Sequence, residues 1–359
     1  MNRKIGIISI SVVLFCLLFT QTASAEYLLT TVPVGVTPFG VAYDSNKGEI
    51  FVTNENSNSV SVISDSTNTV VATVPVGTEP LGVAYDSGKG EIFVTNGGSN
   101  SVSVINDITN VVVATIPVGG DPYGVAYDSS KGEVFTINNL SGTVSVISDS
   151  TNVVVTTIPV GNAPFAVVYD SGKGEVFVAN GGSNSVSVIS DSTNTVVATV
   201  PVGHLPGAVA YDSAKGEVFV GNDNNDTISI ISDSSNIVLA TVPVGNEPYA
   251  IAYDSAKGEV FVAISHANSV SVIRDSDNTI VATVPVGFFP DAVAYDSGNG
   301  EIFVTNENSN SVSVISDSSP PSIPEFPVGG MVLLVIASMA VYLGIRYRTF
   351  KTHNIRGSF

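Results

Sequence analysis

The chain is poor in cysteine and in basic residues. Its central region contains no stretch with the 3.6-residue hydrophobic periodicity of an amphipathic helix. Its single cysteine, Cys16, lies in a hydrophobic run near the start, so we expect the rest to fold without disulfides or thiol chemistry. Between residues 26 and 325, 7 basic residues stand against 32 acidic ones, which leaves a net charge near −25. Such a charge excludes nucleic acid as an expected partner, because phosphates would be repelled.

Motifs of common catalytic machinery are also missing. The sequence contains no Gly-x-Ser-x-Gly elbow, no phosphate-binding loop and no His-Glu-x-x-His helix. Outside the C-terminal tail, His204 and His266 are the only histidines. Together with an acid such as Glu247 they could hold a metal, but solvated loop histidines are the simpler interpretation. We therefore expect no catalytic residue, no bound metal and no cofactor.

The two ends of the chain differ from its middle. Residues 1–25 combine Arg3 and Lys4, an apolar stretch and a small-residue cleavage site, which predicts a secretory signal peptide. Residues 319–327 form a proline-rich stalk, and residues 328–345 are an uncharged run of the length of a membrane helix. Residues 346–359 form a basic tail, which indicates the cytoplasmic side. We expect the region between residues 26 and 318 to lie outside the cell, anchored to the membrane.

That central region is a repeat. Tyr-Asp-Ser recurs seven times at intervals of 42 residues, from Tyr43 to Tyr295. Each unit contains four short strand patterns separated by turns, which predicts an all-β, seven-bladed β-propeller with four antiparallel strands per blade. The seventh unit lacks its fourth strand, and residues 27–32 match the missing sequence. We expect this N-terminal strand to close the last blade and so remove two unpaired sheet edges.

Two segments resemble known families. Phe51-Val52-Thr53-Asn54 and its counterparts resemble the YVTN family of β-propeller repeats, although the sixth unit departs from the motif at Ile264. The resemblance implies the propeller fold and leaves the function open, because such propellers serve both as surface binding modules and as enzyme scaffolds. The C-terminal segment that begins at Pro324-Glu325-Phe326 resembles the PEF-type sorting signals of archaeal surface proteins, and it implies a sorting protease that acts near these three residues.

Comparison of the seven units separates a constant face from a variable face. The Asp-Ser-x-Lys-Gly-Glu turns hardly change between units, and neither do the turns that contain Asp65 and its equivalents in the other six units. We interpret both sets of turns as structural. The loops at the opposite ends of the strands vary, and aromatic residues recur among them. The predicted binding residues on this variable face are Phe39, Glu79, Asp121, Tyr123, Phe165, His204, Tyr249, His266, Phe288 and Phe289. Asn139 and Asn225 begin glycosylation sequons.

From these patterns we expect a non-catalytic binding module on the cell surface. Its partner would be an envelope protein or a glycan, held through the variable face. Two alternatives stay open. One is an extracytoplasmic enzyme of the lactonase or lyase kind that uses His204 or His266. The other is a purely structural envelope component whose regular rim packs laterally.

Overall fold

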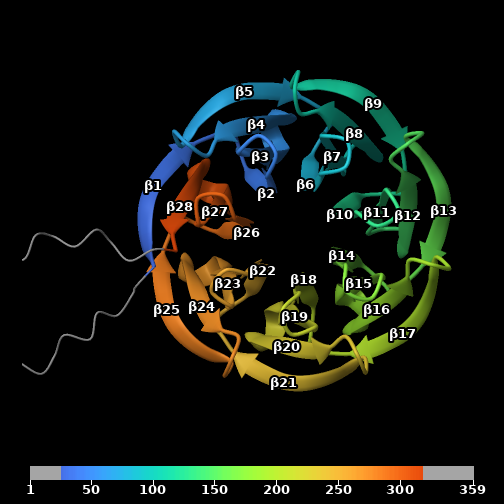
Figure 1. Ribbon diagram of the computed structural model, residues 1–359, viewed down its shortest axis with the longest axis vertical. Helices are drawn as coiled ribbons and strands as arrows, with labels where there is room; N and C mark the ends of the chain where they lie inside the picture. The colour runs from blue at the N-terminus through green and yellow to red at the C-terminus, as the bar shows by residue number, and fades with distance from the viewer. Residues whose placement is uncertain (1–25, 318–359) are drawn as a thin grey trace, which may run out of the picture. The chain divides into compact units, whose positions relative to one another are not determined.

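A computed structural model describes residues 26–317 as a closed ring of seven four-stranded antiparallel sheets, which confirms the predicted seven-bladed propeller (Figure 1). Blades 1 to 6 each use four consecutive strands, starting at β2. The signal peptide, stalk, membrane segment and basic tail predicted for residues 1–25 and 319–359 lie outside the described residues. Within residues 26–317, no helix is long and apolar enough to cross a membrane.

Each blade places its first strand next to the axis and its fourth at the rim (Figure 1). The first strands are β2 (Pro38–Asp44), β6 (Pro80–Asp86), β10 (Pro122–Asp128), β14 (Pro164–Asp170), β18 (Pro206–Asp212), β22 (Pro248–Asp254) and β26 (Pro290–Asp296). The second strands are β3 (Glu49–Asn54), β7 (Glu91–Asn96), β11 (Glu133–Asn138), β15 (Glu175–Asn180), β19 (Glu217–Asn222), β23 (Glu259–Ile264) and β27 (Glu301–Asn306). Proline opens every inner strand, where a missing N–H is tolerated.

The outer half of each blade is built from serine-valine alternation and from β-branched runs. The third strands are β4 (Ser59–Ser64), β8 (Ser101–Asn106), β12 (Thr143–Ser148), β16 (Ser185–Ser190), β20 (Thr227–Ser232), β24 (Ser269–Arg274) and β28 (Ser311–Ser316). The fourth strands are β5 (Thr69–Pro75), β9 (Val111–Pro117), β13 (Val153–Pro159), β17 (Thr195–Pro201), β21 (Ile237–Pro243) and β25 (Thr279–Pro285). Short 3₁₀ turns follow five of the second strands: η1 (Glu55–Ser57), η2 (Gly181–Ser183), η3 (Asp223–Asn225), η4 (Ser265–Ala267) and η5 (Glu307–Ser309).

The ring closes with a strand from the other end of the chain, as the sequence predicts. β1 (Tyr27–Pro33) pairs antiparallel with β28, and the register runs from Tyr27 opposite Ser316 to Pro33 opposite Ser311. The order of this sheet, β1-β28-β27-β26, gives blade 7 its fourth strand. Val32 from β1 is 3% exposed and packs in the core shared by blades 7 and 1. The N-terminal strand therefore contributes both backbone pairing and burial to closure.

The hydrophobic core lies between the blades and is divided into seven repeated clusters. Phe51, which has no exposed surface, packs with Val60 and Val62 of its own blade against Ile92 and Val94 of the next. Equivalent phenylalanines occupy the other six clusters. Burial of a full aromatic side chain in each junction stabilises the contact between neighbouring blades, so the ring is held by seven similar interfaces.

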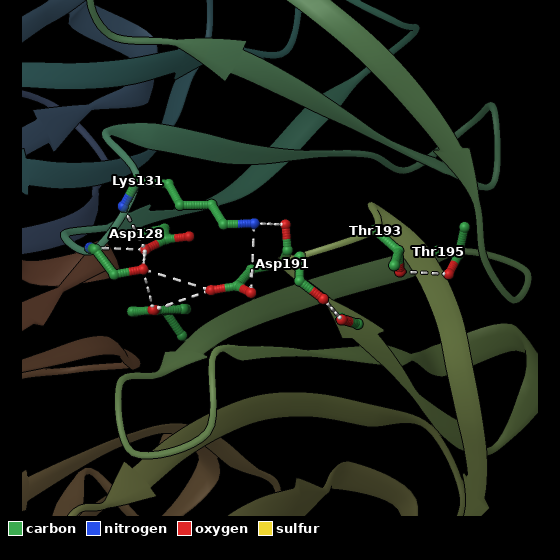
Figure 2. Close-up of polar contacts among 9 residues, drawn as sticks. Asp128, Lys131, Asp191, Thr193 and Thr195 are labelled. Atoms are coloured by element: carbon green, nitrogen blue, oxygen red, sulfur yellow. Dashed lines mark hydrogen bonds and ion pairs between the residues drawn. The ribbon is translucent and has the colours of Figure 1, made fainter.

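The constant face ties neighbouring blades together through the repeated Asp-Ser-x-Lys-Gly turn. In Figure 2, Asp128 Oδ1 accepts the backbone N–H groups of Ser130 at 2.8 Å and of Lys131 at 3.2 Å. The Lys131 ammonium donates to the backbone carbonyl of Asp191 in the next blade, and it lies 3.5 Å from Asp191 Oδ1. Tyr169 donates to Ser130 Oγ at 2.8 Å. These contacts show that the repeated aspartates, and the lysines present in six of the seven units, join neighbouring blades.

Candidate binding site at the mouth of the channel

The loops of the variable face hold a strained residue in every blade. The second residue after each Pro-Val-Gly has a φ between 45° and 58°, including Ala163, Leu205 and Phe289, which are not residues that favour this conformation. In six blades the backbone N–H of this residue donates to a side-chain oxygen of the preceding blade; for Phe289 the acceptor is Asn268 Oδ1 at 2.9 Å. Strain of this kind is retained at positions where the surrounding structure dictates the conformation.

Inner strands position a cluster of aromatic rings across the channel. Phe39 (β2) meets Tyr123 (β10) edge to face with ring centroids 5.4 Å apart, and it meets Tyr249 (β22) at 6.5 Å. Tyr123 in turn meets Phe165 (β14) at 5.2 Å. Threonines fix the backbone at two of these residues, because Thr305 Oγ1 donates to the Phe39 carbonyl at 2.7 Å and Thr95 Oγ1 to that of Tyr123 at 2.6 Å. Four blades that are not all neighbours thus contribute to one aromatic cluster.

A cavity of about 170 Å³ opens beside these rings. Its walls include the four aromatic residues, the glycines of the inner strands and one acid, Asp291 (β26). Asp291 is 4% exposed, and its Oδ2 has no hydrogen-bond donor in the described structure. Burial, followed by the nearby carboxylate of Glu307, raises the pKa of Asp291 to about 8. Burial also raises the pKa of Tyr249, to about 12.

The sixth blade differs locally from the others, and this difference shapes one side of the mouth. In blade 1, a Cβ added to Gly35 would stand 2.5 Å from Cγ of Asn54, so this position requires glycine beside the asparagine. The same contact occurs in every other blade except blade 6. In blade 6, Ile264 replaces the asparagine, and Gly245 has a φ of 123°. The loop that follows carries Glu247, whose Oε2 lies 2.7 Å from Nδ1 of His266.

A second buried acid lies near the mouth. Asp223 is 7% exposed, and burial, followed by the charge of Glu247, raises its pKa to about 7. Its carboxyl group occupies the space beside Gly207, where an added Cβ would stand 2.6 Å from Asp223 Oδ2. Gly207 holds the position that is aromatic in four other blades. The absence of a side chain at this position gives room for the acid.

Some of the predicted binding residues come together and others do not. Phe39, Tyr123, Phe165 and Tyr249 form the aromatic cluster. Phe289 extends it, since its ring lies 6.4 Å from Tyr249 and 5.5 Å from His266. Glu79 and Asp121 occupy strained loop positions in blades 2 and 3, outside that cluster.

The remaining predicted residues lie on the outer part of the variable face. Phe288 is 66% exposed beside the mouth. His204 contacts Asn184 at 3.5 Å, and its backbone N–H donates to Asn225 Oδ1 at 2.5 Å. Asn225 is exposed, whereas the amide of half-buried Asn139 donates to the Pro164 carbonyl at 3.0 Å. No three His, Cys, Asp or Glu residues within residues 26–317 gather as metal ligands, so His204 and His266 do not form a centre with Glu247.

Sequence reasoning missed the acids of the site. Asp291, Asp223, Glu307 and Glu55 are not among the predicted binding residues, yet the first two are buried at the mouth. A signal for Asp291 was available. It occupies the position after the loop proline where Phe39, Tyr123 and their equivalents stand. No such signal exists for Asp223, because its burial depends on Gly207 of the strand beside it.

The class of protein that these features define is a seven-bladed β-propeller. Comparison of the sequence with models of protein families and with curated proteins gave no match in either case. Among solved structures, the fold is similar to a chain of Kuenenia stuttgartiensis hydrazine synthase, with a TM-score of 0.71 and 20% sequence identity. The match covers 79% of this chain and 96% of that chain. At this identity the likeness shows the fold alone.

Proposed function

We propose that this protein is a non-catalytic binding module on the cell surface, which holds an envelope protein or glycan at the mouth of its propeller. The observation that carries the proposal is the cavity bordered by Phe39, Tyr123, Phe165 and Tyr249, with exposed Phe288 beside it. Aromatic side chains on a rigid scaffold bind partners with little loss of conformational entropy. The proposal includes membership of the YVTN-type propellers and a PEF-type archaeal surface anchor, both supported by the sequence patterns.

The test is capture from envelope extracts by the full chain and by a Phe288→Ala, Phe289→Ala double variant. We expect the double variant to lose most of its captured partner. Ile108→Ala serves as the matched control, because Ile108 is 78% exposed on the constant face. Equal capture by the double variant and by the control would remove the mouth as the binding surface.

A second candidate function, lateral packing in an envelope layer, is favoured by the rim. The outer strands expose an apolar band that includes Val71 at 52%, Val113 at 54% and Leu239 at 54%. Exposed apolar side chains repeated around a rim favour contact with a neighbouring surface. Sedimentation of the full chain with Val71→Thr and Val113→Thr tests this candidate: loss of concentration-dependent association would support it, whereas a monomer at all concentrations before substitution would reject it.

The enzyme alternative rests on the contact between Glu247 and His266, whose Oε2 and Nδ1 atoms lie 2.7 Å apart. If the protein were a lactonase or lyase, His266→Ala would abolish a measured turnover. Under the proposed binding function this variant captures its partner as before.

A further inference from the structure

The charged residues of the ring are divided between its two faces. All seven Lys and Arg residues of the described chain lie at the constant face, in the first turns of six blades and at Arg274. The loops of the variable face carry no Lys or Arg. They carry seven acids, namely Glu55, Glu79, Asp121, Asp223, Asp226, Glu247 and Glu307, and Asp291 lies next to them at the start of β26. The field at this mouth is therefore negative, and it attracts cations and repels anions.

One of these acids is built into the cavity wall. Asp291 is 4% exposed, lines the cavity beside Phe39 and Tyr249, and has an Oδ2 without a donor in the part of the chain that the structure describes. A buried polar atom of this kind is costly unless a partner is supplied. The Glu307 carboxyl group shares a hydrogen bond with Asp291, and the loops of the variable face carry no Lys or Arg, so a cationic ligand is the donor that would favour the ionised form of Asp291.

The other residues that line the cavity indicate which chemical class of donor fits it. The cavity of about 170 Å³ is lined mostly by aromatic and small apolar residues. A volume of about 150 Å³ holds one benzene-sized group in proteins. Aromatic faces attract organic cations, and an alkyl stem fits between the rings. A metal ion would require several oxygen ligands, which the cavity does not bring together.

We propose that the mouth cavity binds an alkylammonium group, whose nitrogen lies against Asp291 and whose carbon stem lies among Phe39, Tyr123 and Tyr249. The proposal rests on the proposed function, since it names the chemistry of the same site. Such a group belongs either to a free small amine or to a lysine side chain of a partner protein. The carboxylates of Glu307 and Glu55, which act on Asp291, add to the attraction for the cation.

The protonation of the site supports this chemistry and gives it a signature. The groups that act on Asp291 are Glu307 and Glu55 among the acids, with Tyr249 of the neighbouring blade 6 and Tyr123 of blade 3. With its pKa raised to about 8, the Asp291 carboxyl group is mostly neutral at pH 7. A bound ammonium favours the ionised carboxylate, so binding releases a proton. Affinity then rises about tenfold per pH unit below pH 8 and levels off above it.

The experiment is titration calorimetry of the full chain with n-butylammonium and with its neutral match, 1-butanol. We expect saturable binding of the amine, at least tenfold tighter than the alcohol, and tighter at pH 8 than at pH 6. Asp291→Asn should lower the affinity for butylammonium by about tenfold or more and remove the pH dependence of that affinity. Asp277→Asn is the charge-matched control on the constant face and should change neither. Equal binding of amine and alcohol, or an unchanged Asp291→Asn variant, would overturn the proposal.

A second variant covers the case in which Asp291→Asn fails to fold. Phe39→Leu keeps an apolar wall but removes a ring, and it should weaken butylammonium while leaving butanol nearly unchanged. Equal losses for both ligands would contradict the cation–aromatic contact. The source of the group is resolved with a lysine-containing peptide: tighter binding than butylammonium, lost on acetylation of the lysine, indicates a partner protein, and equal binding indicates a free amine.

The two proposals fail separately. If butylammonium does not bind but the Phe288, Phe289 double variant still loses envelope capture, the ammonium site is wrong and the binding function stands. If butylammonium binds but capture is unaffected by that double variant, the mouth is a small-amine site and the proposed envelope partner is wrong.

Discussion

The rings of Phe39 and Tyr123 meet edge to face at 5.4 Å, although they come from blades 1 and 3. The contact therefore spans the channel and skips the blade between them. Phe39 also reaches Tyr249 of blade 6 from the other direction. A single side chain thus connects three blades at the variable face, far from the inter-blade cores that hold the ring elsewhere.

Replacing Phe39 with alanine should destabilise the protein by about 1–3 kcal/mol, because two aromatic pairs and a half-buried ring are lost. Urea denaturation measures this change, and near-ultraviolet circular dichroism reports the altered tyrosine packing. Phe288→Ala is the matched control: its ring is 66% exposed, so we expect a change within about 0.5 kcal/mol. Equal stability of the two variants would show that the cluster contributes nothing to the fold.

The pairing of β1 with β28 leads to a prediction about the stability of the ring. Deletion of residues 27–32 removes the pairing with β28 and exposes an edge in blade 7, so we expect a large drop in melting temperature and a loss of cooperative unfolding. Val32→Ala, at a 3% exposed position, should cost about 1–3 kcal/mol. Leu29→Ala, at a 44% exposed position of the same strand, should cost far less. A deletion variant that melts like the parent would contradict closure.

Most of the fold was predictable from the sequence because the local pattern of each repeat predicts its strands and turns. The turn aspartates, the left-handed glycines such as Gly48 and the alternating valines all agree with one blade geometry. The closing strand was predictable because residues 27–32 match the fourth strand of other units. The closing strand β1 ends at Pro33, one residue beyond the predicted range.

The site was less predictable, because it depends on contacts between distant blades. Nothing local indicates that Leu205 or Phe289 has a positive φ, because the backbone N–H of each donates to an asparagine side chain of the preceding blade. The sequence indicated which aromatic positions vary, but it did not indicate that Phe39 crosses the channel. The raised pKa of Asp291 is likewise a consequence of burial beside Glu307, a residue 16 positions later in the chain.

The junction of blades 7 and 1 lacks a contact found at the others. Lys89 lies 3.5 Å from Asp149 of the next blade, and lysines at five further junctions reach the carboxylate or the backbone carbonyl of the equivalent aspartate. At the junction with Asp65, Asn299 replaces the lysine. Burial, followed by the charge of Asp296, raises the pKa of Asp65.

Asn299→Lys should therefore stabilise the ring, by roughly 0.2–1 kcal/mol at low salt. The gain should shrink in high salt, because the new pair is partly exposed. Asn299→Gln is the control that lengthens the side chain without charge. Thermal unfolding at two salt concentrations measures the difference, and identical melting of the Lys and Gln variants would show that the missing charge is unimportant for closure.

The two buried acids at the mouth make the stability of the ring depend on pH. In the folded protein the pKa values of Asp291 and Asp223 are raised to about 8 and about 7, whereas an unfolded aspartate titrates near 3.9. Between about pH 4 and pH 8 the folded state therefore binds more protons, so its stability falls as pH rises and levels off above pH 8. Asp291→Asn should remove part of this fall and raise stability at pH 8 by a few kcal/mol. Denaturation midpoints from pH 4 to 9 measure how stability depends on pH.

Asp277→Asn, which removes an exposed acid, is the control and should show the same dependence of stability on pH as the parent. A parent whose stability is flat or rises over this range would show that Asp291 is ionised in the fold.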